Sequence, residues 1–492
     1  MDKYVAVFDV GTTAIKGIIF NKEGQIVADH SIRIQTHHRT NGHIEQNPLD
    51  WWVSLKTISA SWFKEKGILP EQIAFITFSG QMEDVIPILR SGNAPFAILY
   101  SDMRAAKEAQ EIRKKVSDLQ EILGNSISGT TPLAKLAWMK KHQRAVYDDI
   151  HKVLFSSKDF LIYRLTDTYV TDPTTGSTTG MMNAALRSWD PALMEIAGFD
   201  FQKFPEIIDT GDIVGYVTEK AQKETGFLKD TPVLCGAGDG GATAMGAGAM
   251  KPGDSYAYVG TTGWMAVIVE EIQQETSLSS LFHLAHVRNN HFIRIIPLLN
   301  AGNVYAWAVD TFADGDYLRF EQLLQQSDPG SNGLLFLPYL NGERNPIHDP
   351  DAKGAFWGVQ ETSKKHDFAR AVVEGIAFSL KQLAELLSLE EDEEIRIIGG
   401  ITKSSLFCKI LADCLNMYVS VPRNSEYMPA IGSSSSAFIQ LGWVSNEEEF
   451  AERFIDPLQV DIYQPEMTNV TIYQENYNRF LKLYPNLKRI YQ

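Results

Sequence analysis

The stretch Tyr4–Phe20, YVAVFDVGTTAIKGIIF, decides the fold of this chain. Two runs of β-branched and aromatic residues, Tyr4–Phe8 and Ala14–Phe20, flank a turn of hairpin length, which predicts two antiparallel strands. Gly11 permits a turn conformation that other residues adopt only at a steric cost. Asp9 places a carboxylate at a strand end, where a hydrated divalent cation could sit. The stretch therefore predicts a hairpin whose turn binds anionic groups through its backbone N–H groups.

The same turn occurs a second time. Val10-Gly11-Thr12-Thr13 is repeated as Val259-Gly260-Thr261-Thr262, again between two β-type runs. The offset of 249 residues (259 minus 10) is almost half of the 492 residues. The repeat predicts two related halves, and two such loops facing each other would hold the phosphates of a nucleotide.

Length and composition limit the classes of protein that fit. A chain of 492 residues, 44% hydrophobic and 22% charged, predicts two large globular domains. The formal charge of −16 argues against nucleic acid and anionic membranes as partners. The three cysteines have neither metal-site spacing nor a disulfide pattern, and every apolar run is too short for a membrane span. We therefore expect a cytoplasmic protein.

Short apolar strands alternate with amphipathic helices along the chain, which predicts an α/β fold. Strand Ile73–Phe78 and helix Asp367–Leu387 are examples. The Pro252-Gly253 turn before the second hairpin predicts a domain boundary, with an N-terminal domain at 1–250 and a C-terminal domain at 251–492. Residues Thr171–Gly180, TDPTTGSTTG, are expected to form a polar loop, either a linker or a loop on the substrate side.

A glycine-rich segment, Gly236–Gly241, follows the predicted strand Thr231–Cys235 and precedes a small-residue helix. It satisfies the G-x-G-x-x-G pattern of dinucleotide oxidoreductases, but Asp239 inside the loop would repel a pyrophosphate at the helix N-terminus. A carboxylate among glycines suits a general base that accepts a proton from an attacking hydroxyl, while a helix cap is the structural alternative. The chain contains no Gly-Lys dipeptide, so it is not a P-loop kinase.

Two longer motifs resemble the signatures of the FGGY carbohydrate kinases. The first runs from Pro132 to His142, and the second comprises Gly354–Val359 and Asp367–Glu374. Together with both VGTT loops and GAGDGGA, the resemblance covers essentially the whole chain. It implies two actin-like, ribonuclease-H-like α/β domains with ATP and sugar in a central cleft.

The resemblance also implies the roles of individual residues. Asp239 would be the catalytic base, and Asp9 with Asp239 would lie at Mg²⁺. The sugar would contact Gln81, Met82, Glu83, Arg104 and Asp239. ATP would contact Gly11, Thr12, Thr13, Lys16, Gly260, Thr261, Thr262, Gly302, Gly399, Gly400 and Ser404. The expected cofactors are thus ATP and Mg²⁺, and the expected partner is a small sugar, with a homodimer left open.

Three segments bear on the sugar. Tyr339–Arg344 with Pro346, and Asp102–Arg104, resemble xylulokinases, whereas Thr179–Asn183 resembles gluconokinases. Glu83 stands where xylulokinases carry histidine and glycerol kinases carry glutamate; it would bind sugar hydroxyls, or alternatively only pair with Arg104. We expect ATP-dependent phosphorylation of a small open-chain sugar, with D-xylulose favoured. A gluconokinase or polyol kinase, and an actin- or chaperone-like ATPase without a sugar substrate, are the alternatives.

Overall fold

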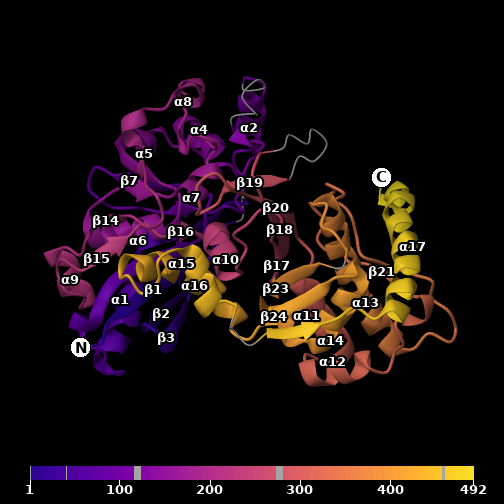
Figure 1. Ribbon diagram of the computed structural model, residues 1–492. Coiled ribbons are helices and arrows are strands. Elements are labelled where there is room, and N and C mark those ends of the chain that lie inside the picture. Colours follow the sequence, from indigo (N-terminus) through magenta and orange to yellow (C-terminus); the bar gives the residue numbers. More distant parts are fainter. Residues whose placement is uncertain are drawn as a thin grey trace.

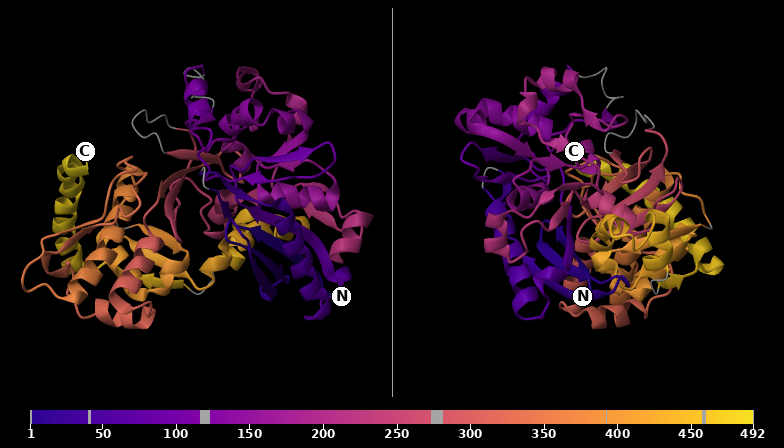
Figure 2. Two further views of the ribbon diagram at one scale, coloured as in Figure 1. Left: turned by 180° about the vertical axis from the view of Figure 1, so that it is seen from behind. Right: turned by 60° about the vertical axis from the view of Figure 1, so that its left-hand side comes forward.

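Two large mixed β-sheets, one in each half of the chain, form the framework of the computed structural model (Figures 1 and 2). The structure describes residues 2–39, 42–115, 123–272, 281–391, 393–456 and 460–491. Within these ranges no helix is both long and apolar enough to cross a lipid bilayer.

The first sheet is built around the hairpin at the start of the chain. Its strands are, in spatial order, β14 (Ile213–Tyr216), β15 (Pro232–Leu234), β6 (Ile73–Gly80), β1 (Tyr4–Val10), β2 (Ala14–Phe20) and β3 (Ile26–Arg33), with β16 (Ala237–Gly238) also on β6. Strands β1, β2 and β3 are antiparallel, whereas β6 runs parallel to β1. The ends of β1, β6 and β16 therefore lie next to one another, which brings the turn of the first hairpin close to the loop that contains Asp239.

The second sheet repeats this arrangement. Its order is β19 (Phe282–Ala285), β20 (Phe292–Leu298), β18 (Gly263–Val269), β17 (Ser255–Val259), β23 (Glu394–Ile398), β24 (Tyr418–Pro422) and β25 (Val460–Tyr463). Strands β17, β18 and β20 are antiparallel, and β23 runs parallel to β17. Each VGTT sequence thus makes the same turn between the first two strands of its sheet, and the predicted repeat of two halves is confirmed.

Helices and small sheets surround the two large sheets. The helices are α1 (Pro48–Lys64), α2 (Ala106–Arg113), α4 (Pro132–His142), α5 (Arg144–Asp149), α6 (Ser157–Thr166), α7 (Pro173–Ser177), α8 (Pro191–Ala197), α9 (Glu219–Thr225), α10 (Asp239–Gly246), α11 (Gly302–Ala313), α12 (Tyr317–Leu324), α13 (Lys365–Leu386), α14 (Ser405–Leu415), α15 (Met428–Gln440), α16 (Glu447–Phe454) and α17 (Met467–Tyr491). The short strands are β4 (His37–His38), β5 (Ile44–Gln46), β7 (Ile86–Leu89), β8 (Ala97–Ile98), β9 (Ile150–Leu154), β10 (Val170–Thr171), β11 (Met182–Asn183), β12 (Ser188–Trp189), β13 (Glu206–Ile207), β21 (Leu335–Leu337) and β22 (Ala355–Trp357).

Helix α15 returns from the second half to the first. It packs on β1, β6 and α10, and Figure 1 shows it in yellow among the indigo and magenta elements of the first half. Its contact with α10 depends on glycine, because a Cβ at Gly432 would lie 2.0 Å from the carbonyl oxygen of Ala242. The division at residue 250 stays a prediction, and α15 is an element from beyond that point that covers the first sheet.

The segment expected to be a polar loop, 171–180, contains a buried helix instead. Residues of α7 are buried throughout, and Asp172 caps the helix by accepting hydrogen bonds from the N–H groups of Thr174 and Thr175. The prediction of a loop was wrong because Asp172-Pro173 is itself a helix start, with an acceptor at the N-cap and proline at the first helical position.

Candidate active site

The first Gly-Thr-Thr turn is held rigidly by neighbouring strands. The Gly11 N–H donates to the carbonyl oxygen of Ala14 (3.1 Å), and the Thr12 hydroxyl donates to Gln81 Oε1 (2.7 Å). Gln46 Nε2 donates to the carbonyl oxygen of Thr12 (2.7 Å), while the side chain of Thr13 is exposed. The side-chain amides of Gln46 and Gln81 therefore hold the turn in place, while Thr13 at its tip stays accessible to a ligand.

The second Gly-Thr-Thr turn lies against two other predicted glycines. The Gly302 N–H, at the start of α11, donates to the carbonyl oxygen of Gly260 (2.9 Å), and a Cβ at Gly302 would lie 2.2 Å from that oxygen. Gly399 has φ = +109°, and a Cβ there would lie 2.5 Å from the carbonyl oxygen of Val259. A Cβ at Gly400 would meet nothing within 4 Å. The structure thus brings Gly260, Gly302 and Gly399 together and leaves space above Gly400.

The remaining nucleotide positions have different surroundings. Thr261 and Thr262 are exposed at the tip of the second turn. Ser404 is buried as the N-cap of α14, where its hydroxyl oxygen accepts the N–H of Phe407 (3.0 Å). Lys16 Nζ donates to the carbonyl oxygen of Glu426 (2.7 Å) and lies opposite Asp9 in the β1–β2 register. Lys16 therefore connects the first hairpin to the segment that leads into α15.

Asp239 is the first residue of α10, directly after β16. Gly238 occupies the N-cap position, so the alternative that Asp239 caps this helix is wrong. Burial and the nearby negative charge of Asp9 raise the pKa of Asp239 to about 7, against a hydrogen bond from the Gly240 N–H that lowers it. Such a carboxyl group accepts a proton at neutral pH more readily than an ordinary aspartate.

Asp9 and Asp239 lie within electrostatic reach of each other and make a two-carboxylate site. Burial also raises the pKa of Asp9, and Lys16 opposes that shift. The described residues contain no group of three or more His, Cys, Asp or Glu side chains placed to hold a metal ion. Two carboxylates nevertheless fit Mg²⁺, which is typically bound by one or two carboxylates, waters and substrate phosphates.

Glu83 follows strand β6 in an unusual backbone conformation, with φ = +63°. Its Oε1 accepts the Thr130 hydroxyl (2.7 Å), and its carbonyl oxygen accepts the buried Lys135 Nζ (2.9 Å). Burial raises the pKa of Glu83, whereas the positive charges of Lys135 and Arg344 lower it. Arg344 belongs to the second half of the chain, so charges from both halves meet at Glu83.

Arg104 does not pair with Glu83, so that alternative is wrong. Its side chain is 1% exposed, and its guanidinium group is bound to Asp102 (2.7 Å) and Glu45 (2.9 Å). The centroid of the Trp138 ring lies 5.1 Å from Arg104 Cζ. Asp102 lies two residues before Arg104, so a local buried ion pair holds the guanidinium group in place.

Gln81 and Met82 directly follow the last residue of β6. Gln81 is buried, and its amide group is bonded to Thr12 and Gln46. Met82 covers the aspartate loop, because a Cβ at Gly238 would lie 2.2 Å from Met82 Sδ. Gln81 therefore supports the first turn, and Met82 packs against the segment that carries Asp239.

Two tyrosines that the sequence analysis did not select also belong to this group. Burial and then the carboxylates of Asp9 and Asp239 raise the pKa of Tyr258, which stacks on Trp264 with 4.3 Å between ring centroids. Burial also raises the pKa of Tyr100, to which the charges of Asp239 and Asp84 contribute. Tyr258 lies within β17 and Tyr100 follows β8, and only the fold places both beside Asp239.

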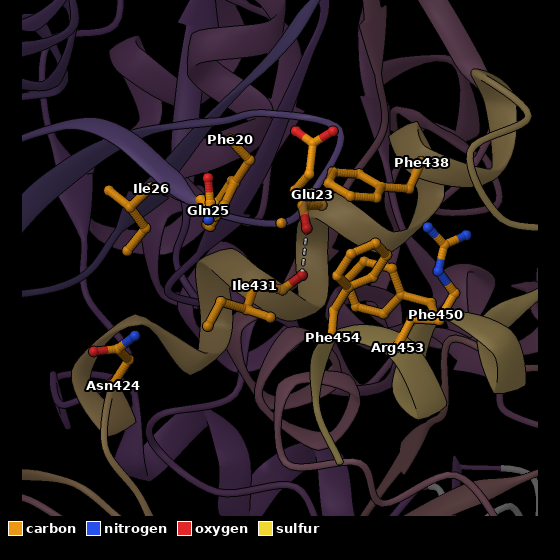
Figure 3. A pocket seen from close by; sticks show the side chains of 12 residues that line it. Phe20, Glu23, Gln25, Ile26, Asn424, Ile431, Phe438, Phe450, Arg453 and Phe454 are labelled. Atoms are coloured by element: carbon orange, nitrogen blue, oxygen red, sulfur yellow. Dashed lines mark hydrogen bonds between the residues drawn. The ribbon is translucent and has the colours of Figure 1, made fainter. Parts of the chain in front are cut away.

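A separate cavity of about 400 Å³ lies between the β2–β3 turn and helices α15 and α16 (Figure 3). Glu23, Arg453 and the rings of Phe438, Phe450 and Phe454 surround it. It is lined by none of the predicted site residues, because it lies at the opposite end of β2 from the Gly-Thr-Thr turn.

Known protein families and solved structures match almost the whole of this chain. Residues 4–246 match the N-terminal domain of the FGGY family of carbohydrate kinases, and residues 207–441 match the C-terminal domain. The chain is 29% identical over 489 residues to the xylulose kinase of Staphylococcus xylosus, covering 98% of this chain and 99% of that protein. Among solved structures it is similar to the ligand-bound xylulose kinase from Lactobacillus acidophilus (TM-score 0.91, 27% identity, 99% of both chains). It is also similar to the gluconate kinase from Lactobacillus acidophilus (TM-score 0.90, 27% identity, 99% of this chain and 98% of that one).

Proposed function

Because the chain belongs to the FGGY family of carbohydrate kinases, we propose that it transfers the γ-phosphoryl group of ATP to a terminal hydroxyl of a small open-chain sugar, with D-xylulose as the favoured substrate. One observation carries this proposal. Asp239, a carboxylate with a raised pKa, lies beside Asp9 and Tyr258, and these two residues adjoin the two Gly-Thr-Thr turns.

The nucleotide would be bound chiefly by the two turns. Backbone N–H groups at Gly11–Thr13 and Gly260–Thr262, with the hydroxyls of the exposed threonines, would hold the phosphates. The open space above Gly400, beside Gly302 and Gly399, would receive the rest of the nucleotide. Mg²⁺ held by Asp9, with Asp239 nearby, would neutralise phosphate charge. Positioning and charge neutralisation are the main sources of rate in phosphoryl transfer.

Asp239 would accept the proton of the attacking sugar hydroxyl. Burial keeps its carboxyl group basic. The absence of a side chain at Gly238 and Gly240 lets Met82 and Leu284 pack closely around the aspartate loop. Glu83 would accept hydrogen bonds from other sugar hydroxyls through the oxygen that Thr130 does not occupy. Gln81, Met82 and Arg104 would act mainly by fixing these groups in place.

A coupled ATP-consumption assay tests the proposal. The wild-type protein is assayed with D-xylulose, D-gluconate, glycerol and no acceptor, and phosphorus NMR identifies the product. We expect turnover that requires a sugar, with the highest kcat/KM for D-xylulose. The similarity to the gluconate kinase makes D-gluconate the second candidate. ATP hydrolysis that no acceptor changes would instead indicate an actin- or chaperone-like ATPase.

A further inference from the structure

Asp172 is a fully buried carboxylate to which the proposed mechanism gives no role. It accepts the N–H groups of Thr174 (3.0 Å) and Thr175 (3.2 Å) and the Thr175 hydroxyl (2.6 Å). It also accepts the N–H of Gly238 (3.2 Å), which is 66 residues away in the chain. The first three bonds are local and serve the helix start, whereas the last one reaches the residue that precedes Asp239.

A buried lysine holds this carboxylate in place. Lys158 Nζ lies 3.0 Å from Asp172 Oδ1 and 2.8 Å from Asp159 Oδ1, and all three side chains have no solvent exposure. Removing one partner of such a group is costly, because it leaves a buried charge without compensation. Lys158 therefore restrains Asp172 strongly, while Asp159 bonds to the N–H of Phe155 and not to the aspartate loop.

The strand before Asp239 needs this restraint. β16 has two residues, and its pairing with β6 is limited to Ala237 with Ser79 and Gly238 with Gly80. A β-ladder of only two residue pairs restrains the direction of the backbone weakly. Asp172 supplies an additional side-chain bond to the backbone at Gly238, and Thr175 Oγ1 would lie 2.9 Å from a Cβ at that residue. The direction in which Asp239 leaves the strand is thus set by α7 as well as by the sheet.

We propose that Asp172 is a positioning residue for the transfer reaction: it holds Gly238 so that the carboxylate of Asp239 faces the sugar hydroxyl. This inference rests on the proposed function, in which Asp239 is the base. A displacement of the base by about 1 Å can cost about 100-fold in rate. Because the proposed function assigns neither ATP nor the sugar to Asp172, its loss should lower kcat and leave both KM values nearly unchanged.

The test compares Asp172→Asn with Asp159→Asn. Each variant removes one of the two carboxylates on Lys158 and leaves it paired with the other, so the change in buried charge is matched. Only Asp172→Asn alters the group that accepts the Gly238 N–H. Kinetics are measured with ATP and with whichever of D-xylulose, D-gluconate or glycerol the wild type phosphorylates, and thermal unfolding is followed in parallel.

We expect Asp172→Asn to lower kcat about 10- to 100-fold with both KM values within about threefold. Asp159→Asn should lower the unfolding temperature comparably and keep kcat within about threefold of wild type. Equal losses of kcat in the two variants, or a loss confined to KM, would overturn the proposal. If Asp172→Asn does not fold, Thr175→Val is the alternative, because it removes one hydrogen bond to the Asp172 carboxylate. This variant should reduce kcat by a smaller factor without changing either KM. An unchanged kcat in Thr175→Val would count equally against the proposal.

Asp239→Asn separates this inference from the proposed function. If Asp239→Asn is inactive but Asp172→Asn behaves like Asp159→Asn, only the positioning role fails. If Asp239→Asn turns over like wild type, the base assignment in the proposed function fails as well.

Discussion

Replacing Glu83 with glutamine tests how the site chooses its sugar. Glu83 Oε1 is occupied by the Thr130 hydroxyl at 2.7 Å, so the second carboxylate oxygen is the group left for a sugar. Glutamine keeps the first acceptor and replaces the second oxygen with an amide NH₂. The change therefore removes a charge-assisted acceptor without removing the side chain or its contact with Thr130.

The expected decrease in kcat/KM follows from the loss of that single hydrogen-bond acceptor. A hydrogen bond to a charged group contributes about 1.5–3 kcal/mol, and leaving its partner unsatisfied costs about 1–3 kcal/mol. A loss of about 1–3 kcal/mol corresponds to a decrease of about 5- to 150-fold in kcat/KM. We expect this decrease for D-xylulose, measured by coupled ATP consumption, while the KM for ATP stays near wild type. For D-gluconate the repulsion between two carboxylates is relieved, so kcat/KM should rise or stay level.

Glu108→Gln provides the matched control. Glu108 is a buried carboxylate on α2 that contacts Lys141 and His142, and it has no place in the proposed site. This variant should keep wild-type kinetics. A wild-type enzyme that prefers D-gluconate, together with a less than twofold response to Glu83→Gln, would refute both the role of Glu83 and the choice of D-xylulose.

Three further changes probe the base, the nucleotide turn and the acid stability. Asp239→Asn should bind ATP and sugar in calorimetry but lose at least about 100-fold in turnover, because the amide cannot accept the proton; wild-type turnover would show that Asp239 is not the base. Thr262→Val should raise the KM for ATP and not that for the sugar, since this exposed hydroxyl is assigned to the phosphates; the reverse result would exchange the two sides of the site. His286 is fully buried, with Nε2 bonded to the Ala249 carbonyl (3.0 Å) and Nδ1 accepting the Arg288 N–H (3.1 Å), and burial lowers its pKa to about 3. The unfolded chain, with a histidine pKa of about 6.5, binds more protons between pH 6.5 and 3, so stability should fall as the pH falls through this range, by about 2 kcal/mol at pH 5. Thermal unfolding at pH 7 and pH 5 should show a smaller acid shift in His286→Gln than in wild type; an equal shift would assign the acid sensitivity to other groups.

The parts of the fold that were predictable are those with local signals. Each VGTT turn is bounded by β-branched strands, so both hairpins and the repeat of two halves followed from the sequence. The glycine loop around Asp239 was also apparent, because a carboxylate among glycines is unusual in both a helix cap and a pyrophosphate loop. Helix α7 had a local signal too, in Asp172-Pro173, which was outweighed by the polar composition of the segment.

The parts that were not predictable depend on contacts between distant residues. Asp172 meets Gly238 across 66 residues of chain, and no pattern in either segment indicates that pairing. Arg344 comes from the other half of the chain, so its lowering effect on the pKa of Glu83 exists only in the folded protein. The burial of Gln81 between Thr12 and Gln46 likewise follows from the parallel pairing of β1 and β6.

The return of α15 to the first sheet affects how the chain folds during synthesis. Val5, Val7 and Ile18 share one apolar core with Phe438 and Met428, so this side of the first sheet lacks its cover until residue 440 of 492 has been made. The earliest strands to leave the ribosome are therefore among the last to be completed. During this interval their exposed apolar side chains are a site for chaperone binding and for aggregation.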